Sequence, residues 1–152
     1  MEKPMRIRFI VLALFVALAS LSLFAQSATS ESPNTSKFVG VWRGQMDGLP
    51  GVEIGICNEG GEFRGAILFH LHIRPDTKSP WTSKSGPPGP MFNMKLDGDT
   101  LRFRVSHKGA HPPGSLNDPP VSFRLALSAP GTAALVNEEE GGPGLIMKRS
   151  DY

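Results

Sequence analysis

Apolar and polar residues alternate along the chain from residue 37 to residue 149, in short runs separated by glycine, proline and aspartate. A period of two places the apolar set on one face of a strand and the polar set on the other. The pattern predicts eight strands, at residues 37–47, 52–58, 62–73, 91–96, 100–107, 121–128, 132–137 and 144–149. No segment carries a helical repeat long enough to form an independent helix, so the predicted fold class is all-β.

The alternation also predicts which side chains face inward. The inward face is shared by aromatic and aliphatic residues of several strands, among them Phe69, Leu71, Phe92, Phe103 and Phe123. Basic residues occupy the opposite face, at Arg64, Arg102, Arg104 and Arg124. These outward residues form either a solvated charged face or a surface for a partner, and the pattern alone favours the solvated face.

Eight short antiparallel strands close most simply into an up-and-down barrel, because closure removes the exposed strand edges. A barrel of eight strands has an interior that is filled by side chains or that holds one small ligand. We therefore predict a single up-and-down barrel domain at residues 37–152. The pattern does not decide whether its interior is filled or holds a ligand.

The lengths of the predicted connections distinguish the two ends of this barrel. Successive connections of an up-and-down barrel alternate between the ends. One end, called here the short-turn end, receives the turns at 58–61, 97–99 and 129–131. The other, the long-loop end, receives the Pro-rich loops at 74–90 and 108–120.

Recognition residues gather on the loops of a rigid scaffold, so we expect the mouth of a pocket at the long-loop end. Trp81 lies in the first long loop, where it has no evident place in the core, and residues 107–111 border the second. Trp81 either covers the mouth, contacts a partner, or packs its loop onto the barrel.

Residues 1–25 have the composition of an export signal. Basic residues, the last of them Arg8, precede an apolar run at 9–24 that ends at Ala25. The run is short for a bilayer-spanning helix, so we expect cleavage, no membrane span afterwards, and a secreted or periplasmic bacterial protein. The polar residues 26–36 are predicted to form a disordered linker.

Removal of this signal changes the charge of the chain. The signal holds three of the 16 basic and one of the 14 acidic residues, which leaves 13 of each. A domain without net charge has no general attraction for nucleic acid, so we predict no nucleic-acid partner. Cys57 is the only cysteine, which excludes an internal disulfide.

No constellation of residues indicates an enzyme. The chain has no Gly-x-Ser-x-Gly motif, and its carboxylates are not predicted to face each other across a site. His70 and His72 share one face of a strand and would bind a metal only if a third ligand approached; an exposed polar face is the simpler interpretation. We therefore predict no catalytic residue, no metal site and no cofactor.

Phe38, Gly40 and Trp42 follow the order Phe-x-Gly-x-Trp. This segment resembles the first-strand signature of the calycin superfamily, which comprises lipocalins, fatty-acid-binding proteins and avidins. The resemblance implies that Trp42 is a structural plug at one end of the barrel. It also implies that a basic residue of the last strand, Arg149 or Lys148, packs over its indole ring. The helices of fatty-acid-binding proteins, the disulfides of lipocalins and the additional tryptophans of the avidin site are absent from the sequence, so no ligand is inferred.

A second resemblance is to an uncharacterised barrel module of secreted bacterial proteins, which sometimes precedes a serine-hydrolase domain. It is carried by a Gly-x-Trp-x-Gly opening at 40–44, by Asp-Gly at 97–98 and by a closing Leu-x-Met-x-Arg at 145–149. This resemblance implies the same barrel fold and adds little about activity.

These features predict a secreted, non-enzymatic protein that binds a small apolar or amphipathic ligand, with its oligomeric state open. The expected ligand-binding residues line the interior and the mouth: Phe69, Leu71, Trp81, Phe92, Phe103, His107 and Phe123. The alternative is a filled barrel that acts as an interaction module for a protein or another envelope component. A hydrolase-associated accessory domain is the third hypothesis.

Overall fold

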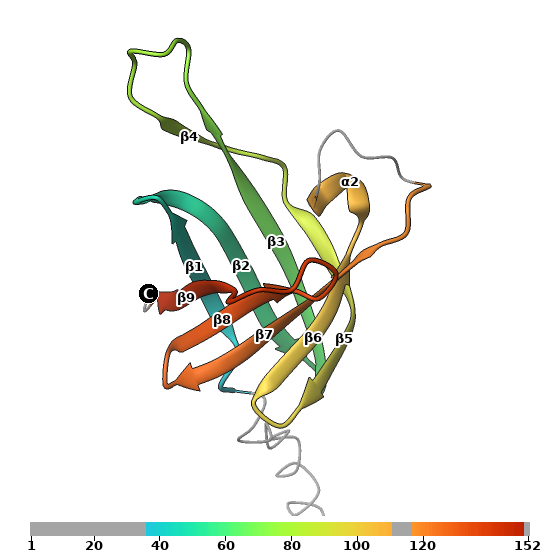
Figure 1. The fold of residues 1–152 in the computed structure, drawn as a ribbon. Coiled ribbons are helices and arrows are strands. Elements are labelled where there is room, and N and C mark those ends of the chain that lie inside the picture. Colours follow the sequence, from blue (N-terminus) through green and yellow to red (C-terminus); the bar gives the residue numbers. More distant parts are fainter. Residues whose placement is uncertain (1–35, 111–116, 151–152) are drawn as a thin grey trace, which may run out of the picture. The chain divides into compact units, whose positions relative to one another are not determined.

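The computed structural model describes residues 36–110 and 117–150. Strands dominate this part of the chain, as the alternation predicts (Figure 1). The strands are β1 (Gly40–Met46), β2 (Leu49–Glu59), β3 (Glu62–Ile73), β4 (Thr82–Ser85), β5 (Gly89–Asp97), β6 (Thr100–Val105), β7 (Val121–Ala129), β8 (Thr132–Asn137) and β9 (Leu145–Ser150). The expected export signal at 1–25 and the expected linker up to residue 35 lie outside the described residues.

Eight of these strands form a closed antiparallel barrel, which confirms the predicted fold class. The neighbours run in the order β2, β1, β9, β8, β7, β6, β5 and β3, and β2 pairs with β3 to close the ring. Closure gives every wall strand two neighbours, although β3 and β5 pair over three residues only, from Gly65 to Ile67. The additional strand, β4, pairs with the end of β3.

The prediction of a loop over 74–90 is wrong in part. Residues Thr82–Ser85 form β4, and β5 begins at Gly89. The last four residues of β3 extend past the barrel rim and pair with β4 instead of with a wall strand. The amide of Gly86 then donates to the carbonyl of Phe69 at 2.9 Å, which fixes the returning chain at the rim. We call residues 70–85 the β3–β4 hairpin, and it projects beyond the barrel (Figure 1).

The second predicted loop, 108–120, also carries some regular structure. It follows β6 and begins within a single helical turn, α2 (His107–Ala110), whose Ala110 amide donates to the carbonyl of Ser106 at 3.1 Å. Within the two described ranges, no helix is long and apolar enough to cross a lipid bilayer.

A bulge in β5 reverses the face on which one predicted site residue lies. The register between β5 and β6 shifts between Phe92 and Lys95, and Asn93 adopts a φ of 53°. Asparagine tolerates this left-handed conformation better than most non-glycine residues do, and an extra residue in a strand interrupts its alternation. Met91 therefore faces the core, 7% exposed, while Phe92 lies opposite Arg104 on the outer face. The prediction that Phe92 points inward is wrong.

Apolar side chains from all eight wall strands pack into one core. The largest fully buried members are Trp42, Phe38, Phe103, Ile54 and Ile67. Gly44 shows how closely β1 approaches β9, because a Cβ atom there would lie 2.5 Å from the sulfur of Met147. This close packing explains the glycine that interrupts the apolar positions of β1.

Candidate functional site

Aromatic side chains from facing walls touch inside the barrel. The ring centroid of Phe69 on β3 lies 6.0 Å from that of Phe123 on β7, and these two strands are not neighbours in the ring. Phe103 on β6 stacks on Phe123 with a centroid distance of 5.8 Å. Pairs at this separation are in favourable aromatic contact. The structure thus brings together three of the predicted ligand-binding residues, but their rings contact one another: Phe103 and Phe123 as cross-strand neighbours, and Phe69 with Phe123 across the interior.

The other four predicted ligand-binding residues lie elsewhere. Leu71 stands above the rim in the β3–β4 hairpin and is 49% exposed, and Trp81 precedes β4 and is 53% exposed. Phe92 faces outward on β5, and His107 begins α2, where its Nδ1 lies 3.5 Å from the carboxylate of Asp118. The predicted set therefore does not form a single pocket, and its role in ligand binding stays a prediction.

Exposed apolar side chains gather on the β3–β4 hairpin. Five large hydrophobic side chains are exposed in the described ranges, and three of them belong to this hairpin: Leu71, Ile73 and Trp81. Leu71 and Ile73 continue the inward-facing positions of β3 beyond the point where the barrel ends. The guanidinium carbon of Arg74 lies 4.7 Å from the centre of the Trp81 ring, a cation–π contact that orients the indole.

The tip of the hairpin is closed by Asp76. Its carboxylate accepts hydrogen bonds from the amides of Lys78 and Ser79, both at 2.8 Å, and from the Ser79 hydroxyl at 2.7 Å. These hydrogen bonds, led by the one from the Ser79 side chain, lower the pKa of Asp76 below its usual value. The sequence gives no reason to single out this residue before the turn is seen.

This arrangement makes the order of the hairpin tip dependent on pH. A carboxyl group whose pKa is lowered by folding adds stability above its unfolded pKa, and that stability is lost as the pH falls through the folded pKa. We expect the amide resonances of Lys78 and Ser79 to titrate with a midpoint below that of an ordinary aspartate. An NMR titration checks this, and an unshifted midpoint would contradict it.

Polar contacts fasten the base of the hairpin to β2. The Pro50 carbonyl lies 2.9 Å from Nε2 of His72 and accepts a hydrogen bond at 3.0 Å from the Ser83 hydroxyl. Nδ1 of His70 lies 3.2 Å from the same hydroxyl. The two histidines considered as metal candidates thus take part in hydrogen bonds, and the described residues contain no group of three or more potential ligands.

Trp42 lies in the core toward the short-turn end, and its role as a plug stays a prediction. Its ring is fully buried, and its Nε1 donates to the Phe38 carbonyl at 2.8 Å. Arg149 lies directly opposite Trp42 on β9, as the calycin resemblance implies, and its Nη1 donates to the Lys37 carbonyl at 3.3 Å. Within the described ranges Arg74 makes a cation–π contact with Trp81 and Arg149 makes none with Trp42, so stacking of Arg149 on the indole stays a prediction.

A hollow of about 310 Å³ lies beside Arg149. Its lining includes Leu127 of β7, Pro130 of the β7–β8 turn and the ion-paired Lys37 and Asp99, whose charged atoms are 3.0 Å apart. The hollow is therefore at the end of the barrel opposite to the one where a pocket mouth is expected.

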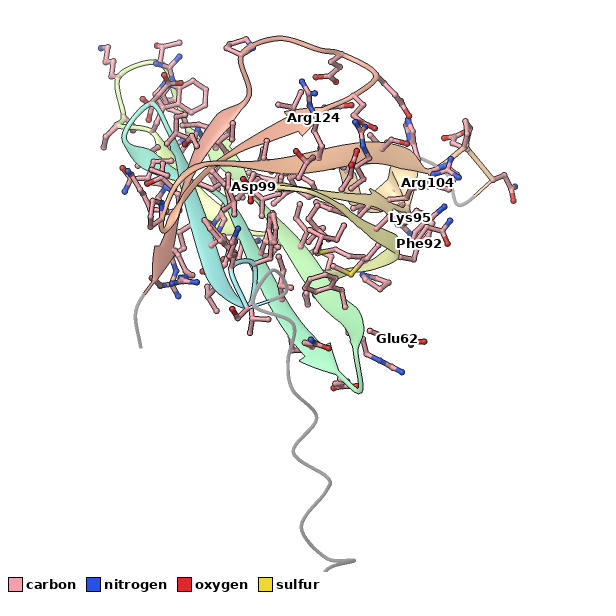
Figure 2. All side chains as sticks on the ribbon, turned by 90° about the horizontal axis from the view of Figure 1, so that it is seen from below. Glu62, Phe92, Lys95, Asp99, Arg104 and Arg124 are labelled. Carbon is pink, nitrogen blue, oxygen red and sulfur yellow. The ribbon has the colours of Figure 1, made fainter. Side chains whose placement is uncertain are left out.

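Basic side chains line the outer face of β5, β6 and β7. Lys95 lies directly opposite Arg102, and Arg102 lies directly opposite Arg124. Arg104 occupies the same face of β6 two residues further on, opposite Phe92. We call Lys95, Arg102, Arg104 and Arg124 the basic row. Figure 2 shows Lys95 and Arg104 beside Phe92, with Arg124 projecting from β7.

Sequence reasoning identified three of these four residues as outward-facing and missed Lys95. Their direct opposition across strands is not visible in the sequence, because it depends on the register that the β5 bulge sets.

No protein-family model, curated protein or solved structure matches the chain. The class of protein is therefore defined by the fold itself, an eight-stranded antiparallel β-barrel with one additional strand.

Proposed function

We propose that this protein is an exported, non-enzymatic interaction module with a calycin-like barrel, and that it binds a protein of the cell envelope through its β3–β4 hairpin. The observation that carries the proposal is the contact of Phe69 with Phe123 across the interior. Side chains that touch from facing walls occupy the volume that a carried ligand would need, so recognition is assigned to the exterior.

The hairpin has the properties of a recognition element. Tryptophan is enriched among the residues that dominate binding energy at protein interfaces, and Trp81 is exposed with its ring held by Arg74. Leu71 and Ile73 add apolar area on the same projecting element. The hydrogen bonds of Asp76 and of the Pro50 carbonyl hold the hairpin in shape before binding, which reduces the entropy lost on association.

Site-specific photo-cross-linking in the cell envelope tests this proposal. A benzophenone side chain at position 81 is expected to give a discrete protein adduct, whereas the same group at position 59, in β2 beside the short-turn end, is expected to give none. The adduct at position 81 should also disappear when Leu71 and Ile73 are both replaced by serine, because their apolar area is then lost.

Two results would contradict the proposal. One is the absence of any adduct at position 81. The other is an adduct that forms equally at position 59 or that survives the double serine replacement, since either would show contact without recognition by the hairpin.

A further inference from the structure

We propose that the basic row is a binding site for an acidic polysaccharide, whose carboxylate groups pair with Lys95, Arg102, Arg104 and Arg124. The inference rests on the proposed function only in placing recognition on the exterior of the barrel. It uses a different wall from the hairpin, so each proposal can fail without the other.

Repulsion within the basic row lowers the stability of the protein when no ligand is bound. Directly opposite residues in an antiparallel pair have Cβ atoms about 4.5–5.5 Å apart, and like charges at that separation destabilise the sheet. Lys95, Arg102 and Arg124 form two such pairs in succession. The Cβ atoms of these three basic residues therefore span about 11 Å, a distance comparable to the screening length of physiological salt.

Few acidic groups offset this repulsion. Glu138 forms an ion pair with Arg102. Asp97 shares the outer face of β5, but it lies opposite Thr100 and its carboxylate forms no ion pair with a residue in the described ranges. The side chains of Lys95 and Arg124 make no hydrogen bond or ion pair with any residue in the described ranges. Their charges are thus available to a ligand.

The chemistry of the row favours carboxylate groups on an extended polymer. Three of the four cations are arginines, whose planar guanidinium groups bind carboxylates with two parallel hydrogen bonds. The row runs across the strands, so it presents charges at the regular spacing of the sheet. Phe92 lies opposite Arg104 and is half-buried, which leaves part of an apolar ring beside the cations for the C–H face of a sugar.

Other polyanions fit less well. Single-stranded nucleic acids are usually held by several aromatic side chains on which successive bases stack, and Phe92 is the single aromatic residue on this face of β5–β7. The predicted export of the protein also places it with envelope polysaccharides rather than with nucleic acid. An anionic membrane surface would call for exposed apolar anchors around the cations, and the residues on this face of β7 include Ser122 and Ala126.

Titration calorimetry with an oligogalacturonate of defined length tests the site. We expect saturable binding that weakens as salt is raised, and no binding of a neutral maltooligosaccharide of equal length. Arg124→Glu is expected to reduce the affinity by about ten- to a hundredfold, because a charge-assisted contact is replaced by repulsion. The matched control is Lys148→Glu on β9, an exposed position on a different wall, which changes the net charge equally and should leave the affinity within about twofold.

A stability measurement separates a binding role from a structural one. Arg124→Thr removes the like-charge pair with Arg102, so it is expected to raise Tm by roughly 1–5 °C while weakening oligogalacturonate binding. A fall in Tm would show that Arg124 stabilises the fold and would overturn the argument from repulsion.

The remaining outcomes of the binding assay overturn the proposal. They are no binding of oligogalacturonate, equal loss of affinity in Lys148→Glu and Arg124→Glu, or tighter binding to a single-stranded oligonucleotide or to vesicles containing anionic phospholipid. None of these results bears on cross-linking at position 81, so failure here is distinguishable from failure of the hairpin proposal.

Discussion

Replacing Phe123 by alanine is expected to lower the free energy of unfolding by about 3–5 kcal/mol. Phe123 is 6% exposed and its ring contacts both Phe69 and Phe103, so its removal deletes contacts from two other strands. The closed sheet holds β3, which carries Phe69, apart from β6 and β7, which carry Phe103 and Phe123. The barrel therefore cannot fully collapse onto the vacated volume. We therefore expect an apolar cavity in the variant, and urea unfolding followed by far-UV circular dichroism measures the loss.

The same variant decides whether the native interior is filled. A dry apolar cavity of this kind binds small aromatic molecules such as benzene. Benzene should therefore raise the Tm of the Phe123→Ala protein, because a ligand that binds only the folded state stabilises that state. The unmodified protein should show no such rise with benzene or with a long-chain fatty acid.

Phe92→Ala provides the matched control for this prediction. It removes the same side chain from the outer face of β5, where no facing wall contacts it, and the expected loss is about 1 kcal/mol or less. A saturable rise in Tm with fatty acid in the unmodified protein would instead support a carrier with an interior that opens. A similar loss in both variants would show that Phe123 is not a central core residue.

The eight wall strands could be predicted because the period-two pattern is a local property of the chain. Closure could be predicted because it leaves no exposed edge on a sheet of such strands. Phe103 and Phe123 alternate with charged or polar residues on two-sided strands, so their inward positions follow directly. Phe92 could not be placed in the same way. The bulge at Asn93 inserts one residue into an otherwise regular alternation. An asparagine in a strand does not by itself predict a left-handed conformation.

The β3–β4 hairpin could not be predicted from the sequence for a different reason. Alternation in β3 continues smoothly through Phe69, Leu71 and Ile73, although only Phe69 lies inside the barrel. The point where a strand passes the rim is set by how far its neighbours extend, and that is a property of the whole sheet. The proline and glycine residues around β4 are typical of a loop, so a strand of only four residues between them could not be predicted.

The two candidate binding surfaces were only partly predictable. Trp81 was identified because a tryptophan in a polar segment lacks a place in the core. The basic row required the register, since a shift of one residue would move Arg102 and Arg124 to the other face of the sheet. Charge on single strands is visible in a sequence, whereas opposition of charges across strands is not.

Replacing Trp42 by alanine is expected to cost about 3–5 kcal/mol, comparable to the loss at Phe123. Trp42 is fully buried at the short-turn end, where its indole fills the core next to the equally buried Phe38. The change also leaves the Phe38 carbonyl without the hydrogen bond that Nε1 donates at 2.8 Å. The chain has two tryptophans, so unfolding should be followed by circular dichroism and not by the fluorescence that the substitution alters.

Two further variants divide this loss between packing and hydrogen bonding. Trp42→Phe keeps an aromatic ring in the core but removes the donor, and it should cost about 1–3 kcal/mol through the unsatisfied carbonyl and the smaller ring. Arg149→Ala should cost less, about 1 kcal/mol, because this side chain is exposed and its hydrogen bond to Lys37 is long at 3.3 Å.

If Arg149→Ala costs as much as Trp42→Ala, the arginine and not the indole closes this end. If Trp42→Ala costs less than about 1 kcal/mol, the plug role of Trp42 is refuted, because a buried indole that large cannot be removed from a packed core without a cavity.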